Sequence, residues 1–303
     1  MPSTKLSGGQ SVAAGVFAGC VTRSCTSPMD VLKIRLQATS TTRARPSWRH
    51  AVATLRTTCL DIYATAGVAG LWRGNLAGCL RLGPYCGIKF CVYDALHDSQ
   101  HSRSGAVDGA IAGMLATMAV YPMEVVRTRL IILAPTRSIG SSLYELYARE
   151  GLRGLYRGGL TGVVGAIPFE GLQFACYEFG KGYATAHHWP AWRWTPTKAE
   201  LSHIDILVTG SLSGIVAQLA AYPFDTIKKR LQAQDLGPSR QYAGLVDCAR
   251  RIVADEGVGA LYRGSLPNLL RIGPYAAIMF ASYEAAKAYL TTEHGRHHPV
   301  STL

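Results

Sequence analysis

Long, mostly apolar stretches alternate along this chain with shorter polar segments. The pattern predicts six long helices, over residues 9–38, 74–98, 105–132, 158–183, 202–233 and 264–290. Most of these exceed the roughly 20 residues that a helix needs to cross a bilayer, so we expect tilts or kinks. The stretches also carry Lys and Arg at depths where a charge usually faces a polar cavity. The pattern therefore favours an all-α membrane protein with six transmembrane helices.

One motif recurs at the end of the first, third and fifth expected helices. It reads SPMDVLKIRLQ from Ser27, YPMEVVRTRLI from Tyr121 and YPFDTIKKRLQ from Tyr222. Small residues four apart let helices approach closely in a membrane, and each proline is preceded by such a pair: Gly15/Gly19, Gly109/Gly113 and Gly210/Gly214. The copies divide the chain into three repeats, over 1–100, 101–198 and 199–303, which form one functional domain.

Two more landmarks occur once in each repeat. A glycine-rich stretch reads AGVAGLWRGN near Gly67, EGLRGLYRGG from Glu150 and EGVGALYRGS from Glu256. It suits a short connecting helix followed by a turn. The second, fourth and sixth helices share a proline nine residues before an aromatic–acid pair. Each repeat is therefore predicted to be a helix, a short surface helix and a second helix.

Composition narrows the classes of function. Only 17% of the residues are charged, below the roughly 25% usual in soluble domains. The net charge of +12 calls for an anionic partner or surface, but the bases are spread among short loops, which argues against nucleic-acid binding. We find no nucleophile–base set, metal-ligand cluster or Walker-type loop, so we expect neither an enzyme nor a metal site. A soluble array of helical repeats is the alternative fold.

The threefold Pro-x-acid-x-x-base-x-base pattern, followed each time by the glycine-rich stretch, resembles the mitochondrial carrier family. The resemblance covers nearly the whole chain. It implies a six-helix barrel with threefold pseudosymmetry and three short surface helices on the matrix side. It also implies a monomeric carrier of the mitochondrial inner membrane that works by alternating access. Both termini would face the intermembrane space, cardiolipin would be a lipid partner, and no cofactor would be bound.

By the same resemblance, the charges that follow the three prolines close the matrix side. The implied pairs are Asp30 with Arg127, Glu124 with Lys228, and Asp225 with Lys33. Gln37 and Gln232 stand where the family braces such pairs, whereas the second repeat has Ile131 there, so we expect a slightly weaker gate at that place. Ion pairs suit a gate because desolvation offsets their attraction and leaves a small net free energy.

A second set of charges, near the ends of the second, fourth and sixth helices, corresponds to the family's cytoplasmic gate. Its members are the acids Asp94, Glu178 and Glu284 and the bases His97, Lys181 and Lys287. Histidine changes its charge near neutral pH, so the pair that involves His97 is expected to depend on pH.

The positions that differ between repeats carry information about the substrate, because a substrate need not be threefold symmetric. The family's three contact points correspond to Arg81, Gly165 with Ala166, and Arg271. The other candidate substrate-binding residues are Arg23, Tyr85, Lys89, Phe169, Glu170, Gln173 and Tyr275. Four bases, one unpaired acid and several rings suit a phosphorylated aromatic ligand, since arginine binds phosphate through a planar fork. Alternatively, Lys89 lines a wet surface, the tyrosines pack between helices, and Gly165 serves helix packing.

Within the family, stretches such as VTRSCTSPMDVLKIRLQ from Val21 resemble the fungal thiamine pyrophosphate carriers. The resemblance implies import of thiamine pyrophosphate, a small phosphorylated anion, in exchange for a nucleotide. The arginines would hold its diphosphate, and Glu170 its thiazolium or aminopyrimidine. One alternative is a carrier of adenine nucleotides or coenzyme A that uses the same four bases. Another, from a different class, is a proton-leak carrier in which Glu170 and His97 act as relays.

Overall fold

The first, third and fifth predicted helices are present as α1 (Gly8–Ala38), α5 (Gly105–Ile132) and α8 (His203–Ala233) in a computed structural model of the chain. The structure describes residues 8–39, 48–97, 105–132, 138–186, 203–234 and 242–297, and this part of the chain contains helices and no strand. Each of the three helices contains the proline of its motif, Pro28, Pro122 or Pro223.

The return helices of the second and third repeats are α7 (Gly159–Ala186) and α10 (Ser265–His297). The first repeat differs, because the single helix predicted over 74–98 is divided into α3 (Asn75–Leu80) and α4 (Leu82–His97). Pro84 has no N–H to donate to the carbonyl of Leu80, which weakens the helix at this place. Arg81, at the junction, keeps helical dihedrals, so the two pieces continue in one direction.

Shorter helices connect the two long helices of each repeat. They are α2 (Trp48–Ala66) with η1 (Val68–Trp72), α6 (Ile139–Leu155), and α9 (Leu245–Arg251) with η2 (Ile252–Glu256) and η3 (Val258–Tyr262). Two glycines per repeat have positive φ in this region: Gly67, Gly74, Gly151, Gly158, Gly257 and Gly264. The predicted turns are therefore built from the same backbone conformation three times.

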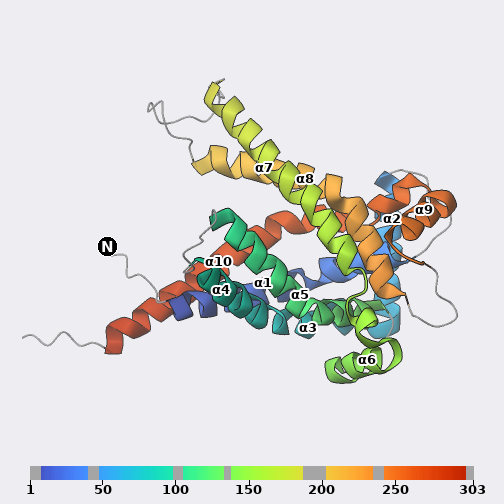
Figure 1. The fold of residues 1–303 in the computed structure, drawn as a ribbon, viewed down its shortest axis with the longest axis horizontal. Helices are drawn as coiled ribbons and strands as arrows, with labels where there is room; N and C mark the ends of the chain where they lie inside the picture. Colours follow the sequence, from blue (N-terminus) through green and yellow to red (C-terminus); the bar gives the residue numbers. More distant parts are fainter. Residues whose placement is uncertain are drawn as a thin grey trace, which may run out of the picture.

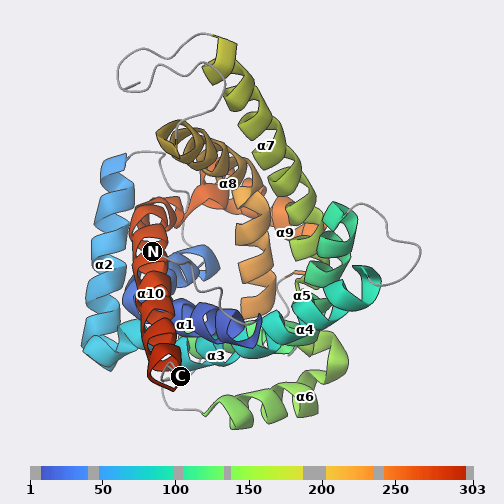
Figure 2. The ribbon, with the colours of Figure 1, turned by 90° about the vertical axis from the view of Figure 1, so that its left-hand side faces the viewer.

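The long helices pack as neighbouring pairs, α1 with α10, α4 with α5, and α7 with α8. Together they stand in a ring (Figure 2). The connecting helices α2, α6 and α9 gather at one end of the molecule, where the fully buried apolar residues also concentrate (Figure 1). At the other end, which holds the beginning of α1 and the end of α10, the α7–α8 pair diverges from the rest. We call these the closed end and the open end.

The GxxxG pairs do not mark close helix contacts. Among their six glycines, only Gly19 has a neighbour where a Cβ would lie, the Leu82 side chain at 3.0 Å. At the other five positions, space for a Cβ is open to 4 Å. The expectation of close approach is therefore wrong at these five places, although the pairs mark equivalent helices correctly.

Several long helices expose large apolar side chains. On α7, Leu160, Ile167 and Phe174 recur every seventh residue and are 73%, 71% and 69% exposed. Residues seven apart lie on nearly the same side of a helix. Judged by length and apolarity, no helix in the described part of the chain meets the requirements for a membrane crossing.

Candidate functional site

Three ion pairs join the repeats at the closed end, and they are the pairs that the family resemblance implied. Arg127 lies 2.8 Å from Asp30, Lys228 lies 2.9 Å from Glu124, and Lys33 lies 3.4 Å from Asp225. Each pair links the first long helix of one repeat to that of another. We call these six residues the charge ring, and each acid with its cations a corner of the ring.

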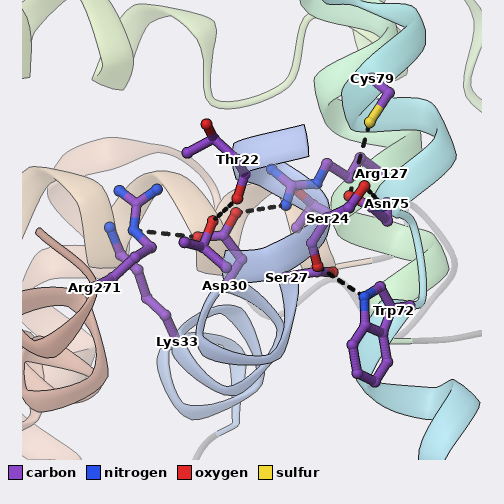
Figure 3. Close-up of polar contacts among 12 residues, drawn as sticks. Thr22, Ser24, Ser27, Asp30, Lys33, Trp72, Asn75, Cys79, Arg127 and Arg271 are labelled. Carbon is purple, nitrogen blue, oxygen red and sulfur yellow. Dashed lines mark hydrogen bonds and ion pairs between the residues drawn. The ribbon is translucent and has the colours of Figure 1, made fainter. Parts of the chain in front are cut away.

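At the Asp30 corner, the carboxylate receives two arginines from different helices. Nη2 of Arg127 contacts one oxygen, and Nε of Arg271 lies 3.3 Å from the other (Figure 3). The Arg271 guanidinium also lies over the ring of Tyr275, 5.1 Å from its centre. Arg271, predicted to bind substrate, is therefore held in this conformation by Asp30, an acid predicted to belong to the gate.

The Glu124 corner is the most positive of the three. Besides Lys228, the carboxylate lies 3.1 Å from Lys229 and 3.5 Å from Arg81. Lys229 was not among the predicted site residues. A second lysine in YPFDTIKKRLQ was the available signal, but the other two copies have an uncharged residue there. Arg81, like Arg271, pairs with a gate acid.

The Asp225 corner has no such second cation. Apart from Lys33, the carboxylate accepts a hydrogen bond of 3.2 Å from Gln218, and its side chain is 40% exposed. The repeat position equivalent to Arg81 and Arg271 is Gly165, which is buried. A Cβ built on Gly165 would lie 2.6 Å from Cβ of Phe224, so this glycine lets α7 and α8 pack closely.

The two glutamines predicted as braces make buried hydrogen bonds beside the ring. Gln232 donates to the Tyr121 hydroxyl at 2.9 Å and accepts from Lys229 at 2.8 Å. Gln37 donates to the Thr226 hydroxyl at 3.4 Å. Ile131, at the third equivalent position, packs instead in a cluster of buried apolar residues that includes Val31, Leu32, Ile34 and Ile62.

Beside the ring lies Arg23, a cation whose side chain has no hydrogen-bond partner among the described residues. Its Nε and Nη1 atoms are buried and make no hydrogen bond. A Cβ on Gly78 would lie 2.9 Å from Arg23 Nη1 and 3.2 Å from Arg127 Nε, so the two arginines pass over this glycine. The electrostatic neighbours of Arg23 include Arg81 and Asp30. A buried donor without a partner is unusual, and an anion is the complementary ligand.

The remaining predicted substrate residues lie toward the open end on α4, α7 and α10. Lys89, Ala166 and Glu170 are exposed. Tyr85, Phe169, Gln173 and Tyr275 are partly buried. Neither Lys89 nor Glu170 forms an ion pair with a described residue. These side chains do not form a closed cluster, and their contact with substrate stays a prediction.

The predicted cytoplasmic gate is not formed in this conformation. Lys287 lies 3.9 Å from Glu284 of the same helix, and Asp94, Glu178 and Lys181 are exposed. His97, whose side chain is 60% exposed, lies 4.0 Å from Asp108 in the first turn of α5. This acid was not predicted. The closed end thus holds a complete set of pairs, whereas the six charges of the open end stay apart from their partners in other repeats.

Two further buried ion pairs lie beyond the glutamines and were also missed. Arg129 pairs with Glu150, and Arg230 pairs with Glu256. The last base of each motif and the acid that opens the glycine-rich stretch were the available signals. In the described part of the chain, no group of three His, Cys, Asp or Glu residues is arranged to hold a metal ion.

The chain is similar in sequence to known proteins. Residues 4–104, 98–188 and 199–294 each match the family described as Mitochondrial carrier protein. The chain is 33% identical to solute carrier family 25 member 43 of Danio rerio, over 93% of this chain and 82% of that protein. It is also 33% identical to a mitochondrial adenine nucleotide transporter of Arabidopsis thaliana, over 94% of this chain and 88% of that protein. Neither relative is named as a thiamine pyrophosphate carrier.

Proposed function

Because this chain belongs to the mitochondrial carrier family, we propose that it imports thiamine pyrophosphate into the matrix in exchange for a nucleotide. The family consists of six-helix membrane carriers, so the chain is a solute transporter of the mitochondrial inner membrane rather than an enzyme. The exposed apolar side chains of α7, among them Leu160, Ile167 and Phe174, suit contact with lipid.

The observation that carries the proposal is the cluster of arginines around the charge ring. Arg23 has buried nitrogen atoms without partners, while Arg81 and Arg271 lie 3.5 and 3.3 Å from Glu124 and Asp30. A diphosphate offers oxygens to several guanidinium groups at once. It would take Arg23 directly and compete with the two carboxylates for the other arginines.

This competition couples substrate binding to the gate. Phosphate oxygens would pair with Arg81 and Arg271 in place of the carboxylates of Glu124 and Asp30. Each carboxylate would then lose one of the cations that stabilise it at the closed end. Binding energy is thereby used to weaken the ring, and a ligand shifts a conformational equilibrium only through such differential contacts. The charges of the open end, including Asp94 and Lys181, would then pair in the opposite conformation.

Glu170 is the residue that favours thiamine pyrophosphate over other phosphorylated solutes. It is exposed on α7 and forms no ion pair with a described residue. A carboxylate in this place attracts the cationic thiazolium or the amino group of the pyrimidine. A polyanionic nucleotide gains nothing from a further negative charge.

The second candidate is an adenine nucleotide carrier. It is favoured by the 33% identity to the relative named as an adenine nucleotide transporter. The arginines described above would bind nucleotide phosphates equally well, so the site chemistry at the closed end does not separate the two candidates.

Counter-exchange in liposomes separates them. The purified protein is reconstituted, the vesicles are loaded with one unlabelled solute, and uptake of labelled thiamine pyrophosphate, ADP and coenzyme A is compared. We expect uptake of thiamine pyrophosphate with either thiamine pyrophosphate or a nucleotide inside. Exchange of ADP without any exchange of thiamine pyrophosphate would replace the proposal by the second candidate. Proton conductance without solute would support a proton-leak carrier.

The role of Glu170 is tested by Glu170→Gln in the same assay. We expect uptake of thiamine pyrophosphate to fall about tenfold, while nucleotide uptake changes less than twofold, because only the cationic ligand loses a partner. The matched control is Asp255→Asn, a change of an exposed acid on η2 that belongs to none of the candidate sites. An equal loss for both solutes in Glu170→Gln would remove the proposed role.

A further inference from the structure

In each of the second and third repeats, a carboxylate lies between two arginines of the same repeat, beyond the charge ring. Arg129 donates to both oxygens of Glu150, at 2.5 and 2.9 Å, and Nη1 of Arg157 lies 3.7 Å away. Glu256 is held in the same way by Arg230 and Arg263. Both carboxylates are buried, with side chains 4% exposed.

The first repeat keeps both arginines and lacks the acid. Arg35 and Arg73 stand at the equivalent positions, but Ala66 replaces the glutamate. Nε of Arg35 donates to the carbonyl of Ile131 at 3.3 Å, and the equivalent arginine makes the same type of contact in both other repeats. The Arg73 side chain has no hydrogen bond or ion pair with any described residue.

The place of the missing carboxylate is preserved in the backbone. A Cβ built on Gly154 would meet Glu150, including its Oε2 atom at 2.8 Å. A Cβ built on the equivalent Gly70 would meet only Ala66, at 2.8 Å, and Ile62. The connecting helix therefore approaches in the same way in the first repeat, while no carboxylate of a described residue is among the nearest neighbours of this place.

The segments of sequence that follow α1 and α5 contain no acid that could balance the positive charge of Arg35 and Arg73. Burial lowers the pKa of Arg73, and the charge of Arg35 lowers it further. Residues 40–47, which follow α1, contain Arg43 and Arg45 and no acid, and residues 133–137 contain Arg137 and no acid. Arg35 and Arg73 are only partly buried, so an anion from solution can reach them.

We propose that Arg35 and Arg73 bind a phosphate-type dianion in the place that Glu150 and Glu256 fill in the other repeats. Two planar guanidinium groups can each offer a pair of N–H donors to such an anion. The site uses no residue of the charge ring and lies at the closed end, among the connecting helices. Its ligand is a free phosphate or the phosphate of a lipid headgroup, which share this chemistry.

The test is thermal unfolding of the purified full-length protein in zwitterionic detergent, with inorganic phosphate titrated against chloride at constant ionic strength. We expect phosphate near ten times its dissociation constant to raise the melting temperature of the wild type by roughly 3 °C. In Ala66→Glu, the new carboxylate fills the site. This variant should melt higher without phosphate and lose the phosphate-dependent shift.

Two further variants keep the test decisive if Ala66→Glu folds poorly. Arg73→Gln removes one of the two ligating groups and should also lose the shift. Arg149→Gln changes an exposed arginine of α6 and should retain it, since that arginine pairs with Glu145 on the protein surface. Phosphate also stabilises proteins generally by its exclusion from their surface, and the Arg73→Gln sample measures that contribution.

A parallel titration with cardiolipin-containing micelles identifies the source of the anion. A shift produced by the lipid alone, and absent in Arg73→Gln, supports the site with a headgroup as its ligand. A phosphate shift of the same size in the wild type, Ala66→Glu and Arg73→Gln would overturn the proposal, as would the absence of any shift with phosphate and with lipid.

Discussion

The Glu124 and Asp225 corners of the charge ring occupy equivalent places in the second and third repeats, yet the charges around them differ. Glu124 has Lys228, Lys229 and Arg81 at 2.9, 3.1 and 3.5 Å. Asp225 has one described cation within 4 Å, Lys33. The Glu124 side chain is 15% exposed, whereas that of Asp225 is 40% exposed.

The difference shows that the sequence contains two kinds of information about the charge ring. The threefold motif determines where each acid and its base stand. Residues at which the repeats differ, such as Lys229, Arg81 and Gly165, determine how strongly each corner is held. A carboxylate paired with three cations is difficult to separate from them. A partly exposed carboxylate with one cation readily exchanges that partner for water. We therefore expect the Asp225 corner to separate more easily than the Glu124 corner.

The largest expected effect is on stability. Glu124→Gln leaves three cations close together and largely out of water, which should cost about 3–5 kcal/mol of unfolding free energy. Asp225→Asn, its control at the other corner, leaves a single cation, Lys33, which keeps its hydrogen bond of 3.0 Å to Asn268, so this change should cost less, about 1–2 kcal/mol. Thermal unfolding in detergent measures both. Equal losses at the two corners would contradict the comparison.

Charge exchange at the weak corner tests the pairing itself. Lys33→Asp and Asp225→Lys should each lower solute exchange at least tenfold, because a like-charged pair then faces the partner repeat. The double variant restores an opposite-charge pair and should recover most of the exchange rate. Such a recovery measures the coupling of the two residues. A double variant no better than the worse single variant would show that the pair is unimportant.

A third prediction concerns the corner without a glutamine. Ile131→Gln introduces the residue that braces the other two corners, but Ile131 is fully buried among apolar side chains. The amide would find no partner, so we expect a loss of about 1–3 kcal/mol. Ile131→Val, which only removes a methylene, should cost about 1 kcal/mol. A stabilising glutamine would show that the apolar cluster rearranges.

The smallest effect is expected for Lys229→Gln. Glu124 keeps Lys228 and Arg81, so its neutralisation is largely preserved, and the free energy of unfolding should change by about 1 kcal/mol or less. Lys229→Gln combined with Glu124→Gln should be less damaging than the sum of the two changes, because one of the stranded cations is then absent. Additive losses would indicate that Lys229 stabilises something other than this corner.

The sequence predicted the long helices well, because apolar length and repeated landmarks are local properties. The range 105–132 was predicted for α5 and is observed as Gly105–Ile132. The division at Arg81 was not predicted, since equivalent prolines stand within continuous helices in α7 and α10. Alignment of the three motifs located the acids and bases of the charge ring, and the resemblance to a known family predicted which of them would meet.

Other features of the site depend on how the helices pack, which local patterns do not contain. The reach of Arg81 and Arg271 to the gate acids follows from the positions of neighbouring repeats. The GxxxG spacing suggested close contacts, but helices α5 and α8 leave open space at those glycines. The open-end charges are apart only in the conformation described above. The sequence of a carrier must allow this conformation and the opposite one, so it does not tell which of the two gates is formed.

A reversible cross-link across the Asp225 corner tests most directly whether the charge ring must open during transport. Lys33→Cys and Asp225→Cys are combined in a variant from which the native cysteines other than Cys248 have been removed. Of the removed cysteines, Cys25 and Cys91 are exposed. Cys248 can remain, because burial raises its pKa to about 12. The reference is the exchange rate of this variant before a short, reducible thiol cross-linker joins the two positions. We expect cross-linking to abolish solute exchange and reduction to restore it. Exchange at an unchanged rate in the cross-linked protein would show that the corner need not separate, and that the charge ring is not a gate.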